Sequence, residues 1–183
     1  MGAKRTLQLG LALEIIGIAG LGITLTSTST GWEMAPWLVA YGVGIGYATG
    51  QLASIILSGV SGHDSSVAGA FQSTSRQLGA ALGTAVLGTT LVIGLGSAAE
   101  TLEAKGVPTG QAQEISQELQ DSGGESISDL ATEPGGVDLV QVATGTFTTA
   151  SKSVAWVVVV AISAGLLVSF WIPKNAAREK QAG

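Results

Sequence analysis

The sequence predicts an all-α polytopic membrane protein, in which 183 residues form a single membrane domain with four transmembrane helices. Two long apolar runs, 37–60 and 154–172, carry no charged residue. Each is long enough to cross ~30 Å of hydrocarbon at about 1.5 Å per residue. Two further runs, 7–25 and 68–95, are each interrupted by one charge. We therefore expect spans at about 7–26, 36–58, 68–95 and 150–172.

The basic residues at the chain ends predict the orientation. Lys4 and Arg5 precede the first span, and residues 174–180 contain three more Lys and Arg. Because such residues near span ends stay on the cytoplasmic side, we expect both termini in the cytoplasm of a multi-pass protein of the plasma or bacterial inner membrane. The polar segment 96–149, with nine acidic residues and one lysine, then lies outside, as a mobile loop or as a cap. A cleaved signal peptide is disfavoured because the first run is long and contains Glu14.

Several function classes lack the residues that they need. The chain contains no cysteine, so it has neither a disulfide framework nor a thiolate metal site. It has no Walker motif for nucleotide binding, and its only histidine, His63, lies in a short loop without companion ligands. Nucleic-acid binding requires a basic patch, whereas the net charge is −5. We therefore expect no enzyme activity, no cofactor, no metal and no nucleic-acid partner.

Small residues recur at a four-residue spacing in the second and third predicted spans. This spacing lets membrane helices approach closely, so helix packing is the first interpretation. The second span carries one such stripe, of Gly42, Gly46 and Gly50. The third carries two parallel ones, formed by Gly79 with Gly83 and by Ala80, Thr84 and Gly88. The alternative is that the second span is a flexible helix that lines a cavity, with Tyr47 and Gln51 as polar groups along a pathway.

The two charges inside the spans are a third feature. Glu14 and Arg76 both lie about 10–12 Å from the cytoplasmic ends of their predicted spans, by helical rise. A bare charge at that depth is disfavoured, so we expect the two to interact. The alternatives are that Arg76 extends to the interface and that Glu14 carries protons, since burial favours the neutral carboxyl. The candidates for a substrate or proton pathway are Glu14, Arg76, Gln72, Tyr47 and Gln51.

The third predicted span carries a recognisable pattern. Ser75-Arg76-Gln77-Leu78-Gly79, followed by Gly83-Thr-Ala85-Val86-Leu-Gly88, resembles the penultimate helix of fourteen-helix drug/proton antiporters. These form the EmrB/QacA-like branch of the major facilitator superfamily. The glycine-rich span before it resembles the preceding helix of that family. The resemblance covers the whole chain as the last four helices, a partial C-terminal bundle. The N-terminal half, with its antiporter motif and proton-coupling carboxylate, has no counterpart.

The resemblance implies a function. We expect a C-terminal fragment of a proton-coupled multidrug-type efflux transporter, inactive alone because such proteins need two bundles that move about a central site. Its partners would be the lipid bilayer, the remaining transporter helices, protons and a hydrophobic drug-like substrate. The alternative is a stand-alone four-helix protein that forms homo-oligomers through its glycine stripes, as a small exporter or a scaffold.

Overall fold

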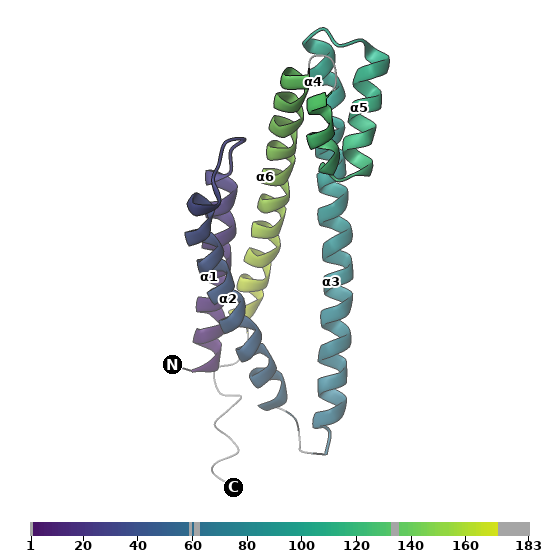
Figure 1. Ribbon diagram of the computed structural model, residues 1–183. Helices are drawn as coiled ribbons and strands as arrows, with labels where there is room; N and C mark the ends of the chain where they lie inside the picture. Colours follow the sequence, from purple (N-terminus) through teal and green to yellow (C-terminus); the bar gives the residue numbers. More distant parts are fainter. Residues whose placement is uncertain (1, 59, 61–62, 133–135, 172–183) are drawn as a thin grey trace.

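The computed structural model describes residues 2–58, 60, 63–132 and 136–171. Within them the chain is all helical (Figure 1). Four helices are long, and three short ones form a compact unit between the third and the fourth long helix, which we call the cap. The long helices are α1 (Ala3–Thr24), α2 (Gly31–Ser58), α3 (Ser65–Gly96) and α6 (Gly136–Ser169). The cap contains α4 (Ala98–Ala104), α5 (Thr109–Asp121) and the 3₁₀ helix η1 (Glu125–Thr132).

Consecutive long helices run in opposite directions (Figure 1). As a result, the start of α1 and the end of α6 lie at one end of the molecule, and the cap lies at the other. A hydrogen bond of 2.9 Å from Lys4 Nζ to the carbonyl oxygen of Phe170 joins these two ends. The side chains of Gln8 and Ser169 meet one turn further in, at 3.4 Å.

Three stretches of the described chain are long and apolar enough to cross a membrane: Ala3–Thr24, Ser65–Ala104 and Asp138–Ser169. This confirms an all-helical chain with segments suited to a bilayer. The second predicted span, 36–58, falls within α2, where several side chains lie outside the described residues. The count of four spans therefore stays a prediction. Helix α6 begins at Gly136, well before the predicted start of the last span, because its first turns belong to the cap.

Helices α1 and α2 pack in close backbone contact. A Cβ atom placed on Gly10 would lie 2.6 Å from the backbone nitrogen of Ala48, and one on Gly17 would lie 2.7 Å from that of Tyr41. On α2, a Cβ atom at Gly44 would lie 2.7 Å from the carbonyl oxygen of Gly10. Because backbone atoms cannot move aside as a side chain does, these positions accept only glycine. The pair thus uses the small-residue packing that membrane helices favour.

Helix α6 connects this pair to α3. Along α1, it lies near Gly22, where an added Cβ atom would be 3.4 Å from that of Ala155. Toward the cap it touches α3, since a Cβ atom on Gly94 would lie 2.5 Å from that of Ala150. Leu95, next to this contact, is fully buried. Helix α3 is thus held at its cap end, while only 6% of its most apolar stretch is buried inside the chain.

The cap has a hydrophobic core of its own. Its buried side chains come from α4, α5, η1 and the first turns of α6. Leu102 and Leu119 are almost completely buried at its centre. The full set is Ala98, Leu102, Ala112, Ile115, Leu119, Leu130, Leu139, Val142 and Ala143. Of the two expectations for segment 96–149, a mobile loop or a cap, the described part fits a folded cap.

Glycines set the ends of the two cap helices. Gly106 and Gly123 have φ angles of 91° and 61°, in the left-handed region that side chains disfavour. After α4, the N–H of Val107 donates to the carbonyl oxygen of Leu102, and after α5 that of Gly124 donates to Leu119. These are Schellman ends, and each reverses the chain directly beside a buried leucine. Gly123 therefore ends α5 for a local reason, namely the left-handed backbone required there.

The α1–α2 contact predicts a difference between two neighbouring glycines. Gly44→Val should lower the thermal unfolding midpoint in detergent, because the new side chain meets the backbone of α1. Gly46→Val is the matched control, since nothing lies within 4 Å of its added Cβ atom. This control should match the parent chain or exceed it, since valine forms helix better than glycine. Equal midpoints for the two variants would contradict the contact.

The cap core predicts a second outcome. Leu119→Ala should destabilise the cap by about 2–5 kcal/mol, because the leucine is fully buried. Cleavage by a glutamyl protease after Glu118, which requires α5 to open, should accelerate in proportion. Leu82→Ala, at a position that is 68% exposed on α3, is the control and should leave the cleavage rate unchanged. Fast cleavage of the parent chain would show that the cap is not folded.

Candidate functional site

Glu14 is a buried acidic residue in the contact between α1 and α2. Only 9% of the residue is exposed. Its side chain lies over Gly44, where an added Cβ atom would be 2.8 Å from Cγ of Glu14. Glycine at position 44 therefore leaves the room that the glutamate side chain occupies. This places a carboxyl group inside a helix pair, which is the position expected for a functional rather than a solvated charge.

Arg76 and Gln72 lie on α3, away from this contact. Arg76 is exposed and Gln72 is half-buried. In the part of the chain that the structure describes, no ion pair joins Glu14 and Arg76, so the predicted interaction is wrong. Arg76 lies roughly 16 Å along α3 from Ser65, by helical rise. A helix of this apolarity thus carries an exposed guanidinium well inside its length.

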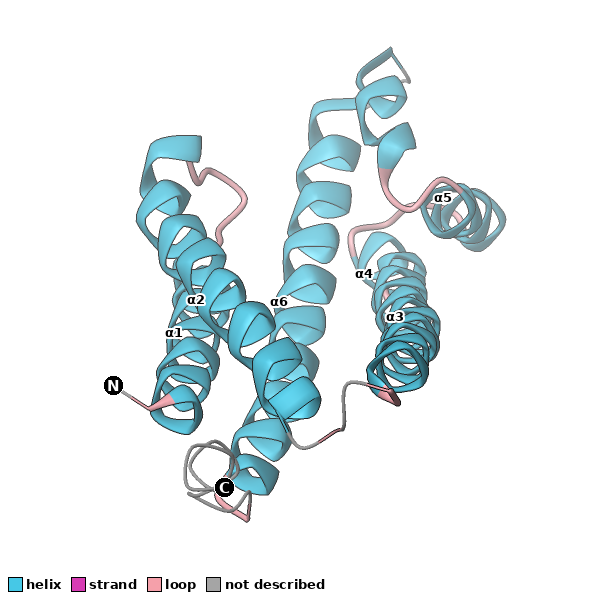
Figure 2. Cartoon of the chain, turned by 90° about the horizontal axis from the view of Figure 1, so that it is seen from below, coloured by secondary structure: helices cyan, strands magenta, loops and turns pink. Residues whose placement is uncertain are grey.

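The arrangement of the helices explains this correction. Seen from below, α6 lies between α1 and α3 (Figure 2). Glu14 faces α2 rather than α3, because the glycines of α1 select that side. Equal depth along two helices does not bring two residues together when a third helix intervenes.

The other pathway candidates, Tyr47 and Gln51, lie on α2. Tyr47 is 50% exposed and Gln51 is half-buried. Gly46 lies about 200° around the helix from Gly44, so the predicted glycine stripe of α2 faces away from α1. Nothing lies within 4 Å of a Cβ atom added at any glycine of the predicted stripes. These are Gly42, Gly46, Gly50, Gly79, Gly83 and Gly88. Their role in packing against a further helix stays a prediction.

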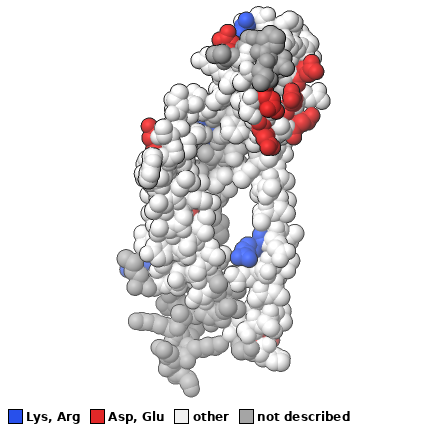
Figure 3. Space-filling model, viewed as in Figure 1, with Lys and Arg blue, Asp and Glu red and all other residues white. Residues whose placement is uncertain are grey.

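Charge is distributed unevenly along the molecule. Acidic side chains gather at the cap end, over α4 and α5, and the long helices show little charge on the same face (Figure 3). The exposed acidic residues of α5 include Glu114 and Glu118. In the described residues, no three of the side chains that usually bind metal come together. The acidic surface thus provides a general negative field rather than a defined site.

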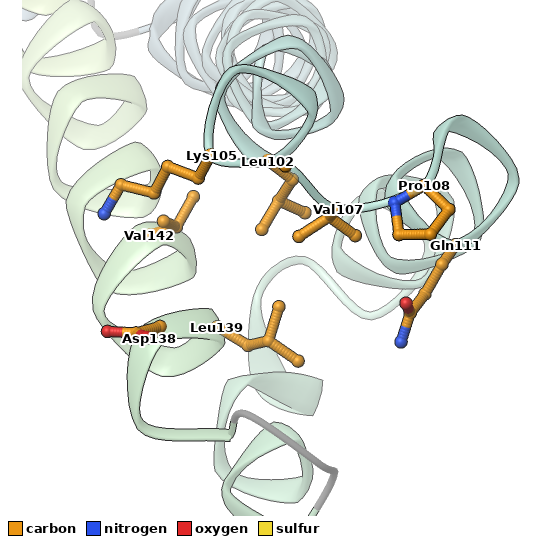
Figure 4. Close-up of a pocket in the computed structure, with 9 residues that line it drawn as sticks. Leu102, Lys105, Val107, Pro108, Gln111, Asp138, Leu139 and Val142 are labelled. Atoms are coloured by element: carbon orange, nitrogen blue, oxygen red, sulfur yellow. The ribbon is translucent and has the colours of Figure 1, made fainter.

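One hollow of about 490 Å³ opens between α4, α5 and α6 in the cap. Leu102, Val107 and Leu139 point toward its centre, and Lys105 and Asp138 lie on one side (Figure 4). The lining also includes the polar Gln111, so the hollow is more polar than most small-molecule sites, which are predominantly apolar.

No family model, curated protein or solved structure matches the chain.

Sequence reasoning missed the glycines that form the contact within the chain. Gly10, Gly17 and Gly20 lie on one face of α1 together with Glu14, at spacings of three and seven residues. This mixed spacing hides the stripe from a search for four-residue repeats. A glutamate on the same face as three glycines was the signal that could have revealed it.

The separation of Glu14 and Arg76 predicts independent effects. In a double-mutant cycle with Glu14→Gln and Arg76→Gln, the changes in unfolding free energy should add within about 0.5 kcal/mol. Thermal unfolding in detergent gives the four values. A coupling energy well above 1 kcal/mol, of the kind that residues in contact show, would place the two side chains together.

Proposed function

We propose that the chain is a C-terminal module of a proton-coupled multidrug-type efflux transporter, which contributes helices to a larger bundle and does not transport alone. The observation that carries the proposal is Arg76. It is exposed on a helix suited to a membrane, and no acidic side chain in the described residues pairs with it. An arginine at such a position normally faces protein or a water-filled cavity, so we expect further helices to lie beside α3.

The open glycine faces support the same proposal. In the described chain, nothing lies within 4 Å of a Cβ atom added at Gly42, Gly46 or Gly50 on α2, or at Gly79 or Gly83 on α3. Helices that present small residues usually do so for another helix. Residues 75–88 also resemble a penultimate antiporter helix. We therefore propose that these glycine faces contact the other helices of a transporter. In this arrangement both chain ends are cytoplasmic and the cap is extracytoplasmic.

The same faces also favour the second candidate, self-association of a stand-alone four-helix protein. A homo-oligomer would cover the glycine faces of α2 and α3 with those of another copy. The buried Glu14 would then serve an exporter formed by identical subunits. The two candidates differ in what covers these faces.

In-membrane photocrosslinking distinguishes the candidates. A photoreactive residue at Gly83, which lies in open space, should capture a second membrane protein in cells. The captured chain should carry the proline-glycine motif that is typical of the N-terminal half of such antiporters. The same probe at Ile23, which is 67% exposed on α1 but outside the glycine faces, is the control and should not capture it. Capture of a second copy of this chain would instead favour the oligomer.

Transport measurements give the second arm of this test. The purified chain in proteoliposomes should show no dye efflux driven by a proton gradient. A chain that transports alone would contradict the module proposal, whatever the crosslinking shows.

A further inference from the structure

A crevice of about 370 Å³ lies between α3 and α6, on the side of the cap contact where the two helices diverge. Its α3 wall consists of Thr84, Leu87, Gly88 and Leu91, and its α6 wall of Ser151 and Val154. Leu87 and Gly88 both lie three or four residues from Thr84 and from Leu91, so the four α3 positions share one helix face. Both walls belong to stretches that are long and apolar enough to cross a membrane.

The crevice is closed at one end. Toward the cap, the contact between Gly94 and Ala150 brings the two helices together, and Leu95 is fully buried beside it. Leu91, one helical turn further from the cap than Leu95, is only half-buried. Away from the cap the helices separate, and the space-filling view shows an opening between α3 and the other helices (Figure 3). The crevice is thus a tapering groove that is open to the side.

We infer that this crevice binds one hydrocarbon chain of a membrane lipid. Leu87, Leu91 and Val154 make most of the lining apolar, and Thr84 and Ser151 add two hydroxyls. Water in the crevice therefore has few hydrogen-bond partners. An empty cavity loses the dispersion contacts of its lining. In a bilayer, the groups available to fill it are lipid chains, which reach it through the open side.

The geometry favours a lipid chain over a helix. Two packed helices have axes about 8–10 Å apart, so a third helix between α3 and α6 would require about twice that separation. By helical rise along α3, the crevice begins at Leu91, about 5 Å from the Gly94–Ala150 contact, and ends at Thr84, about 15 Å from it, which is too close for such a divergence. Leu87 and Val154, one from each wall, are both half-buried. A thin, flexible chain fits between them.

The inference has a direct test that does not depend on transport. The chain is reconstituted in phosphatidylcholine vesicles with a diazirine in the middle of one acyl chain, irradiated and digested. Mass spectrometry then compares the label on peptides with residues 84–91 and 151–154 with the label on the exposed part of α6 near Leu167. We expect the crevice peptides to be enriched, and to keep this label after exchange into unlabelled lipid for longer than the Leu167 region does.

Two matched variants on α3 establish the site. Gly88→Phe projects a ring into the crevice, whereas Gly79→Phe projects one from another face of the same helix, and both added Cβ atoms meet open space. The first should remove the enrichment and the second should preserve it. Ser151→Phe blocks the crevice from the α6 wall and should act as Gly88→Phe does, which covers the case that one variant fails to fold.

Three outcomes would overturn the inference. Labelling that is no stronger in the crevice than near Leu167 would show ordinary surface lipid. Labelling that survives both blocking variants, or falls equally in the Gly79 control, would place the lipid elsewhere. Disulfide formation between two copies of a Gly88→Cys chain, in place of lipid labelling, would show that a second copy covers the crevice.

Discussion

The close backbone contact between α1 and α2 is the interaction on which the remaining arrangement depends. Lipid chains are as apolar as leucine, so apolar surface alone does not bring helices together in a membrane. Gly10 and Gly17 on α1 and Gly44 on α2 remove the side chains that would keep the backbones apart. The contact fixes which face of α1 is internal, and Glu14 is buried because it lies on that face. The hydrogen bonds from Lys4 and Gln8 then hold α6 against the same helix pair.

The cap is held together by a different force. Its helices bury Leu102, Leu119 and their neighbours away from water, as a small soluble domain does. The cap joins the end of α3 to the start of α6, and the Gly94–Ala150 contact continues this junction into the long helices. Beyond this point α3 has little support from the chain. Its exposed Arg76, its open glycines and the crevice beside α6 all follow from this one-ended attachment, and all three are places where something else can bind.

The sequence predicted correctly those features that depend on the residues of a single helix. The charge-free apolar runs predict helices directly, and three of the described stretches are long and apolar enough to cross a membrane. Gly123 predicts the end of α5, because the left-handed backbone that ends a helix is favourable for glycine whatever lies around it. Reasoning failed where the result depends on which helix lies beside which. A glycine stripe such as that of Gly42 and Gly46 shows that another helix can pack closely on that face. Which helix does so depends on how all the helices assemble.

The predicted pairing of Glu14 with Arg76 failed for the same reason. Depth along a span follows from counting residues, whereas adjacency requires the order of helices around the bundle. The position of α6 between α1 and α3 follows from contacts such as Gln8 with Ser169 and Gly94 with Ala150. These pairs are more than fifty residues apart in sequence. A local pattern contains no information on contacts of this kind.

Hydrogen exchange of the intact chain in lipid nanodiscs, measured across a urea series, tests the central claim that two separate forces hold this molecule. The amides of α5 should be protected without urea and should lose protection together at a moderate urea concentration, as a hydrophobic core in water does. At that concentration the amides of α1 and α2 should still be protected, because their contact does not depend on the exclusion of water. Exchange of α5 at the rate of an unfolded peptide without urea, or a single shared midpoint for both regions, would contradict the account.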